Sequence, residues 1–181
     1  MAAKTPQPAS DSTKTALTHV ENTLDPIIFP DSRVLLLGSM PSPKSREIGF
    51  YFGNPQNRFW RVVAALYGEK PLKSISEKID FCKRHHLALC DVLKACDIKG
   101  ASDASIANPI PHNIGALIQD SSICAIFTLG GTATKFYKRY TEQQTGIPAR
   151  QLPSTSPANA RMSVEDLVEE FSIIKKFTIV S

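Results

Sequence analysis

Two polar loops hold the side chains of this sequence that are best suited to binding and chemistry. The first, residues 39–58, interleaves aromatic residues with Asn and Gln. Aromatic rings can stack on a flat base, and amide side chains can donate and accept hydrogen bonds in the same step. The second, residues 153–161, offers hydroxyls and backbone N–H groups that can bind phosphate oxygens without lysines. Together the loops favour a site that combines stacking, hydrogen bonding and phosphate contacts.

Each loop also has a purely structural interpretation. The aromatic residues 50–52 could simply attach the first loop to the core, and residues 153–161 could be a Pro/Ser linker. For Phe59 and Trp60, which lie at helical spacing, core packing is the favoured interpretation. Asn57 would be the N-cap of a helix that starts at Arg58, so N-capping is its alternative role.

The sequence lacks the motifs of several common enzyme classes. It has no P-loop, and no glycine-rich dinucleotide fingerprint follows a strand. Ser39, Ser42 and Ser154 have no histidine in a matching motif, which disfavours a serine hydrolase. Four cysteines have spacings that fit no compact zinc or iron–sulfur pattern, which favours buried free thiols: Cys82, Cys90, Cys96 and Cys124.

Apolar runs and turn signals predict the elements that position these loops. Helical spacing, with two capping boxes, alternates with short segments that fit buried strands. This alternation predicts an α/β fold with a doubly wound parallel sheet in a single domain. The predicted strands are residues 33–38, 87–93, 123–129 and 149–152, and the predicted helices are residues 59–67, 74–86, 112–119, 132–140 and 163–174.

A parallel sheet brings the carboxyl ends of its strands to one edge, and ligands bind outside that edge. The segments that follow the predicted strands hold most of the unusual polar side chains. We therefore expect one crevice there, surrounded by residues 39–58, Asp91 to Lys94, Gly130-Gly131 and residues 153–161.

Composition is that of an ordinary globular domain with a mild excess of positive charge. The chain has 181 residues, 42% apolar content and a net charge of +4, which allows an anionic partner without requiring one. Residues 1–22 lack periodicity and predict a disordered tail, which leaves residues 23–181 as one domain. Because no transmembrane run or secretory signal is found, we expect no membrane partner and an intracellular location, cytoplasmic in a prokaryote or nuclear in a eukaryote.

Two motifs resemble the uracil-DNA glycosylase superfamily, and within it most closely the hypoxanthine-DNA (deoxyinosine) glycosylase branch. The first motif comprises residues 38–42, GSMPS, and residues 49–60, GFYFGNPQNRFW. The second comprises residues 152–159, LPSTSPAN. The likeness extends over about residues 24–177, and both motifs occur in order at predicted strand ends.

The resemblance implies a three-layer α/β/α domain with a four-stranded parallel sheet. Its activity would be hydrolysis of the N-glycosidic bond of deaminated bases, hypoxanthine above all and uracil as a second substrate, in base excision repair. The base would first be flipped out of double-stranded or single-stranded DNA. We expect a monomer with no cofactor and no metal. Only Lys44 and Lys94 are near the cleft for a lyase step, so we expect a monofunctional enzyme.

The resemblance also assigns roles to residues. Many relatives carry Asp or Asn where this chain has Met40, which cannot hold a water molecule, so Asn57 is the expected catalytic residue. Phe52 is expected to stack on the flipped base, and Tyr51 to shape the same wall. The expected base-binding residues are Ser39, Met40, Pro41, Tyr51, Phe52 and Asn54, and the expected DNA contacts are Lys44, Arg58, Ser154, Thr155, Ser156, Pro157, Ala158 and Asn159.

Two alternative functions stay open at this point. Met40 would also suit a DNA-binding module that has lost catalysis. An α/β hydrolase that acts on a small nucleotide-like molecule would use the same crevice.

Overall fold

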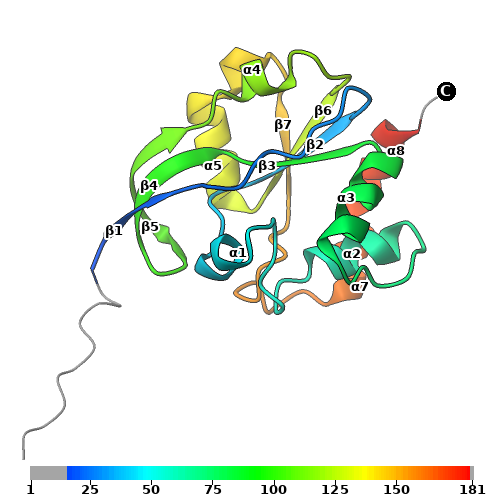
Figure 1. Cartoon of the computed structure of the whole chain (residues 1–181), viewed down its shortest axis with the longest axis horizontal. Coiled ribbons are helices and arrows are strands. Elements are labelled where there is room, and N and C mark those ends of the chain that lie inside the picture. Colours follow the sequence, from blue (N-terminus) through cyan, green and yellow to red (C-terminus); the bar gives the residue numbers. More distant parts are fainter. Residues whose placement is uncertain (1–15, 180–181) are drawn as a thin grey trace, which may run out of the picture.

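Four parallel strands form the central sheet of the protein, whose computed structural model describes residues 16–179 (Figure 1). Strand β2 lies inside the sheet and pairs with both β3 and β6. Every residue of β2, β3 and β6 is buried, which confirms the prediction of strands covered on both faces. The sheet order is β3 (Leu87–Asp91), β2 (Val34–Gly38), β6 (Ala125–Leu129) and β7 (Ala149–Leu152).

Helices cover both faces of this sheet and produce the predicted three layers (Figure 1). Val34 and Leu36 of β2 pack in one core with α2, α3 and α7. Leu35 and Leu37 point to the opposite face and pack in a second core with α4 and α5. The helices are α2 (Phe59–Leu66), α3 (Ile75–Arg84), α4 (Ile114–Ile118), α5 (Gly131–Tyr140), α6 (Glu142–Thr145), α7 (Val164–Phe171) and α8 (Lys175–Thr178), with a 3-10 turn at Ser172–Ile174.

The capping signals that placed two of these helices are confirmed. The Ser74 hydroxyl accepts from the backbone N–H of Glu77, and the Glu77 carboxylate accepts in return from the N–H of Ser74. Ser163 and Asp166 form the same reciprocal pair at the start of α7. Phe59 and Trp60 on α2 are 0% and 7% exposed, as core packing requires.

A second, antiparallel sheet was not predicted. Strand β4 (Leu93–Lys99) lies between β1 (Thr18–Glu21) and β5 (Ser102–Pro111). The predicted helices and strands leave residues 97–109 unassigned, and β1 lies inside the predicted tail of residues 1–22. Residues 1–15 of that tail are outside the described part of the chain. The sheet matters for function because its β4–β5 turn reaches the site.

A short helix, α1 (Pro43–Ile48), gives the first loop its shape. The Ser42 side chain caps its first turn, Pro43 occupies the start, and Gly49 ends it in the left-handed region with φ +79°. Three cysteines, Cys82, Cys90 and Cys96, are buried, and all four thiols of the chain are free. None of the helices described for residues 16–179 combines the length and the apolar character needed to cross a membrane.

Candidate functional site

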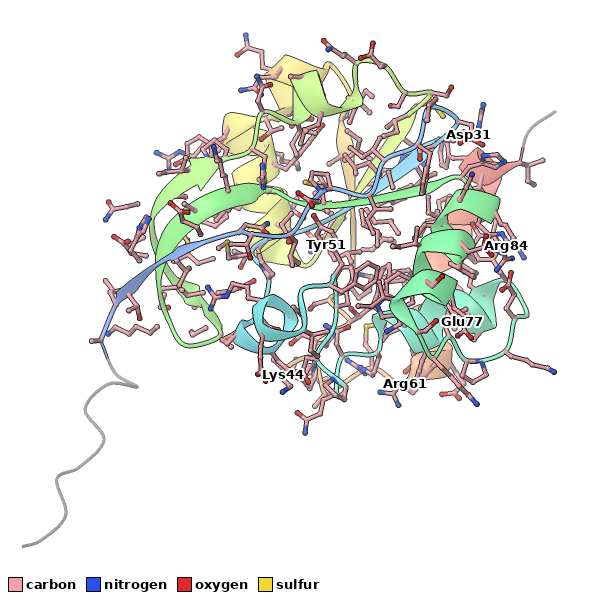
Figure 2. All side chains as sticks on the ribbon, in the orientation of Figure 1. Asp31, Lys44, Tyr51, Arg61, Glu77 and Arg84 are labelled. Carbon is pink, nitrogen blue, oxygen red and sulfur yellow. The ribbon has the colours of Figure 1, made fainter. Side chains whose placement is uncertain are left out.

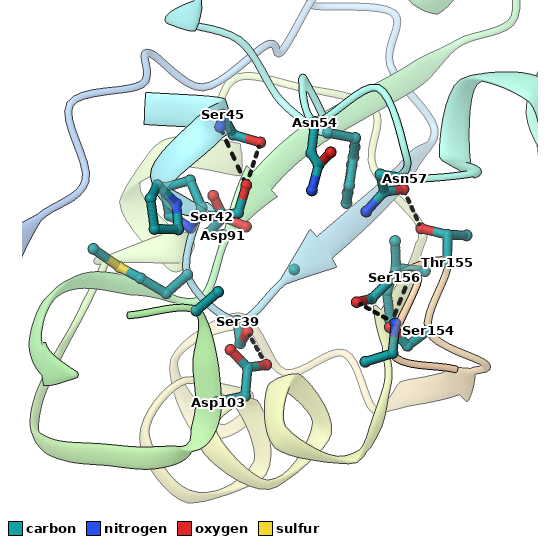
Figure 3. A pocket seen from close by; sticks show the side chains of 18 of the residues that line it. Ser39, Ser42, Ser45, Asn54, Asn57, Asp91, Asp103, Ser154, Thr155 and Ser156 are labelled. Atoms are coloured by element: carbon teal, nitrogen blue, oxygen red, sulfur yellow. Dashed lines mark hydrogen bonds between the residues drawn. The ribbon is translucent and has the colours of Figure 1, made fainter. Parts of the chain in front are cut away.

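A cavity of about 710 Å³ opens at the carboxyl edge of the parallel sheet (Figure 3). Both predicted loops contribute to its walls, as the sequence predicted. The β4–β5 turn, residues 98–103, adds a wall that the sequence did not indicate. Gly130-Gly131 does not reach the cavity, and the neighbouring Leu129 lines it instead. The volume of the cavity lies in the range found for small-molecule binding sites.

Phe52 presents an aromatic ring to this cavity. Phe59 stacks on the ring at a centroid distance of 4.0 Å and an interplanar angle of 21°. With that face covered by Phe59, the opposite face is the one that a ligand can use. Phe52 also has a φ of +52°, a conformation that costs a non-glycine residue roughly 1–2 kcal/mol. Such local strain is typical of binding sites, where the surrounding structure holds the residue in place.

Asn57 lies across the cavity from the first turn of α1, and its amide has a fixed orientation (Figure 3). Its Oδ1 accepts from the Thr155 hydroxyl at 2.8 Å and from the backbone N–H of Phe59 at 2.9 Å. With the oxygen used in this way, the Nδ2 group is the part of the amide that faces the cavity (Figure 3). From the position before the N-cap residue Arg58, Asn57 therefore caps the first backbone N–H of α2, that of Phe59, and also offers the cavity a hydrogen-bond donor.

Arg58 connects the two loops of the site. Its backbone N–H donates to the Thr155 carbonyl at 3.0 Å. Its guanidinium donates to three carbonyls of the second loop and to that of the residue directly after it; the four belong to Thr155, Ser156, Asn159 and Met162. The side chain does not line the cavity. The structure therefore gives Arg58 a bracing role that the sequence did not indicate, while its predicted contact with DNA stays a prediction.

The second loop is shaped by its own hydrogen bonds (Figure 3). The backbone N–H groups of Ser156 and Ala158 donate to the hydroxyls of Ser154 and Ser156, and the N–H of Asn159 donates to the Ser156 carbonyl. Several of the N–H groups that were expected to be free for phosphate are thus already engaged. Pro157 and Ala158 form the exposed tip. The loop lines the cavity from Ser154 to Asn159.

Ser39 and Met40 form the floor near the β4–β5 turn. The Ser39 hydroxyl donates to Asp103 Oδ2 at 2.6 Å, which ties the first motif to β5. Burial raises the pKa of Asp103 above its usual range, while the Ser39 hydrogen bond opposes that rise. Met40 is 8% exposed and lines the cavity with Pro41. The first motif thus presents no carboxylate or amide side chain of its own at this position.

The remaining predicted residues take different positions. Asn54 lines the cavity, and its Oδ1 accepts from the backbone N–H of Gln56 at 3.0 Å, so its Nδ2 group faces the cavity as a second donor (Figure 3). Tyr51 lines the cavity from within the core: it is 2% exposed, and burial raises the pKa of its phenol (Figure 2). Lys44 lies on the outer side of α1, paired with Glu47 at 3.0 Å, and does not line the cavity.

Sequence reasoning did not assign a role to Asp91, which follows the apolar run of β3 and lines the cavity. Its side chain accepts from Asn22 Nδ2 at 3.2 Å. Burial, with the nearby Asp103 carboxylate, raises the pKa of Asp91 to about 7. Its place at the end of a buried parallel strand was the available signal. Within residues 16–179, no group of His, Cys, Asp or Glu side chains is arranged to hold a metal ion.

Substituting Gly38→Ala should displace the Asp91 carboxylate. A Cβ atom at residue 38 would lie 2.4 Å from Asp91 Oδ1, closer than any side chain tolerates. We expect the free energy of unfolding to fall by about 1–3 kcal/mol, the usual cost of overpacking. Gly131→Ala is the matched control, because a Cβ there meets nothing within 4 Å. Equal denaturant midpoints for the two variants would contradict this packing.

The comparisons with known proteins agree with this geometry. The family model for the uracil DNA glycosylase superfamily matches residues 26–173. A hypoxanthine DNA glycosylase of Methanosarcina acetivorans is 30% identical over 138 residues, which cover 76% of this chain and 87% of the relative. A hypoxanthine DNA glycosylase of Methanosarcina barkeri is 29% identical over 75% of this chain and 86% of its own length.

A solved structure shares the fold. It is a solution NMR structure of a protein from Methanosarcina acetivorans that is described as a candidate uracil DNA glycosylase. The superposition has a TM-score of 0.74 with 27% sequence identity and covers 86% of this chain and 97% of that one. Residues 26–173, which the family model matches, include all four strands of the parallel sheet and both loops of the site.

Proposed function

Because the chain belongs to the uracil DNA glycosylase superfamily and is a DNA glycosylase, we propose that its substrate is deaminated DNA and above all deoxyinosine. The enzyme flips the base into the cavity and hydrolyses the bond between C1′ and the base. Free hypoxanthine and an abasic site are the products, and uracil is a second substrate. The two relatives named hypoxanthine DNA glycosylase support this choice of base.

One observation carries the proposal: a ring with one covered face lies in the same cavity as two amide N–H donors. The open face of Phe52 stacks on the extruded base, a contact worth roughly 1–3 kcal/mol per base. That contact offsets part of the flipping cost of a few kcal/mol. The donors on Asn54 and Asn57 then reach the acceptor edge of the base.

Catalysis follows from where charge develops. As the glycosidic bond breaks, positive charge grows on the sugar and negative charge grows on the departing base. Asn57 Nδ2 donates a hydrogen bond to the developing negative charge, and its fixed orientation avoids reorganisation during the reaction. Water attacks after the bond has lengthened, so a neutral amide is sufficient and Met40 is tolerated.

The second loop and α1 bind the DNA strand around the extruded nucleotide. Hydroxyls of Ser154 and Ser156 bind phosphate oxygens, Thr155 contributes by holding the Asn57 amide, and Lys44 and Arg58 add positive charge. Pro157, Ala158 and Asn159 occupy the gap left by the base. The cavity is lined by Arg46 but by no lysine among the described residues, which supports a monofunctional enzyme without a lyase step.

An oligonucleotide with one deoxyinosine tests the function. After incubation with the protein, alkali should cleave the strand at that position, and free hypoxanthine should be detected by mass spectrometry. Without alkali the strand should stay intact. A gel shift with no cleavage would indicate an inactive DNA-binding module, and no shift or cleavage would favour a small nucleotide-like substrate.

A further inference from the structure

Asp91 is a buried carboxyl that the function described so far does not use. It is 3% exposed, yet it lines the cavity. The point where Gly38 lacks a Cβ is 2.4 Å from Asp91 Oδ1 and 3.9 Å from Cε1 of Phe52. The carboxyl oxygen and the edge of the stacking ring therefore flank the same small space. In the proposed function, we expect a base that stacks on Phe52 to extend over this space.

The neighbouring Asn22 determines which carboxyl oxygen can carry a proton. Asn22 Oδ1 accepts from the backbone N–H of Leu24 at 3.0 Å, which fixes the orientation of the amide. Its Nδ2 group then donates to Asp91 Oδ2 at 3.2 Å and to the Leu93 carbonyl at 3.3 Å. Because Oδ2 already accepts a hydrogen bond, the proton of a neutral Asp91 resides on Oδ1, the oxygen beside Gly38 and Phe52.

The groups around Asp91 favour its neutral form. Asp103 of β5 is a second carboxyl near it, and Tyr51 and Cys90 present a phenol and a thiol that burial keeps protonated. Arg46 of α1 lines the same cavity. Within residues 16–179, neither Asp91 nor Asp103 forms an ion pair with a lysine, arginine or histidine. A buried carboxyl without a cation is the usual arrangement for a general acid.

We propose that Asp91 is the general acid of the reaction and delivers a proton from Oδ1 to N7 of the departing purine. This inference rests on the proposed function, because it concerns the hypoxanthine leaving group. N7 is the basic ring nitrogen of this base. A purine that gains a proton there leaves as a neutral molecule, and hydrogen-bond donors alone can only stabilise the anion. General acids of this kind contribute about 10²–10⁴-fold to rate.

The step balances without a co-reactant beyond water. The C1′–N9 bond breaks, and its electron pair goes to N9. The proton of Asp91 forms the N7–H bond, so hypoxanthine departs neutral and Asp91 becomes a carboxylate. The oxygen of a water molecule bonds to C1′, and the proton that this water loses restores neutral Asp91 through solvent. The net reaction consumes deoxyinosine and water and yields hypoxanthine and the abasic sugar.

The pH dependence of single-turnover excision tests the proposal. For the wild type, the rate should be constant below about pH 7 and fall about tenfold per pH unit above it, because only the neutral acid is active. Asp91→Asn should be about 10²-fold slower or worse at pH 6 and should show no such fall. The variant keeps an oxygen that can accept from Asn22, so its packing is preserved.

Asp103→Asn serves as the matched variant. It removes the negative charge that raises the pKa of Asp91, so the fall in excision rate should persist but begin at a lower pH.

Thermal unfolding at different pH values gives a readout apart from activity. A carboxyl whose pKa is raised on folding binds a proton in the native state, so wild-type stability should decline between about pH 4 and pH 7 relative to Asp91→Asn.

A further experiment uses the wild-type protein with the substrate 7-deaza-2′-deoxyinosine and needs no protein variant. It lacks the N7 acceptor, so the wild type should excise its base about 10²-fold more slowly than hypoxanthine and without the fall above pH 7. Asp91→Asn should not slow this substrate further, because the two changes remove one interaction.

Three results would overturn the proposal, and they separate its failure from that of the proposed function. If the wild type excises hypoxanthine and Asp91→Asn retains its rate and pH profile, Asp91 is not the acid and the proposed function stands. If the wild type excises 7-deazahypoxanthine as fast as hypoxanthine, the same conclusion follows. If the wild type excises no hypoxanthine at any pH, the proposed function and the acid both fail.

Discussion

Replacing Asn57 with Ala should reduce single-turnover excision of hypoxanthine by about 10²–10³-fold, the usual cost of removing one oriented donor. The reason is the fixed amide: its oxygen is held by Thr155 and Phe59, and its nitrogen faces the cavity. The rate should be measured with enzyme in excess over an oligonucleotide that carries one deoxyinosine, with alkali treatment to reveal abasic sites.

The Ala variant also loses the N-terminal cap of α2, and this loss must be separated from catalysis. We expect it to lower the free energy of unfolding by about 1 kcal/mol. A protein of marginal but sufficient stability stays folded at 25 °C after such a loss. Gel shifts should still detect binding to the same oligonucleotide. Wild-type excision rates in Asn57→Ala would show that Asn57 is only a cap.

The second large effect is expected for Arg58→Lys and concerns stability first. One guanidinium donates to four carbonyls within residues 155–162, and a single ammonium group cannot reach all of them. Hydrogen bonds from charged donors contribute about 1.5–3 kcal/mol each, so we expect the free energy of unfolding to fall by about 2–4 kcal/mol. Denaturant unfolding followed by circular dichroism measures this change.

Arg58→Lys should also slow excision, because the second loop supplies Thr155, which holds the Asn57 amide in place. Arg61→Lys is the matched control: this arginine lies one turn further along α2, is exposed, and points away from the body of the protein (Figure 2). Its stability should stay within about 0.5 kcal/mol of the wild type. If Arg58→Lys and Arg61→Lys unfold at the same denaturant concentration, the hydrogen bonds that Arg58 donates to the carbonyls do not contribute to stability.

The parallel sheet could be predicted because three of its four strands are buried on both faces, and only β7 has exposed residues. Residues 34–37 are all apolar and are followed by Gly38, which is typical of a short strand covered on both faces. The antiparallel sheet could not be predicted in the same way. Strand β5 is rich in Ser, Asp, Asn and Ala, which have low β-propensity, and its pairing with β4 is interrupted by register shifts.

Helix α1 was missed for a different reason. It has only six residues, and it lies inside a loop that Pro and Gly mark as irregular. Pro43 at its start and Gly49 just past its end are nevertheless the expected signals of a helix. Taken together, these two residues mark the start and the end of α1.

The position of the site could be predicted from the sequence, but the orientation of its side chains depends on tertiary contacts. Motif order placed both loops at the correct edge, because chain direction alone brings parallel strand ends together. The orientation of the Asn57 amide depends on Thr155, which is 98 residues away in sequence. The burial of Asp91 and the partners of Arg58 are likewise tertiary properties. Residue type indicated a charged DNA contact for Arg58, and only the structure shows its carbonyl partners.

The most direct test of the account is the excision rate of Asn57→Asp. A carboxylate at residue 57 still accepts from Thr155 and Phe59, so the cap and the loop contact survive, but an oxygen replaces the N–H group that faces the cavity. We predict a variant with wild-type thermal stability that excises hypoxanthine as slowly as Asn57→Ala. An Asp variant as fast as the wild type, or faster, would contradict the account, because residue 57 would then act as an acceptor that activates water.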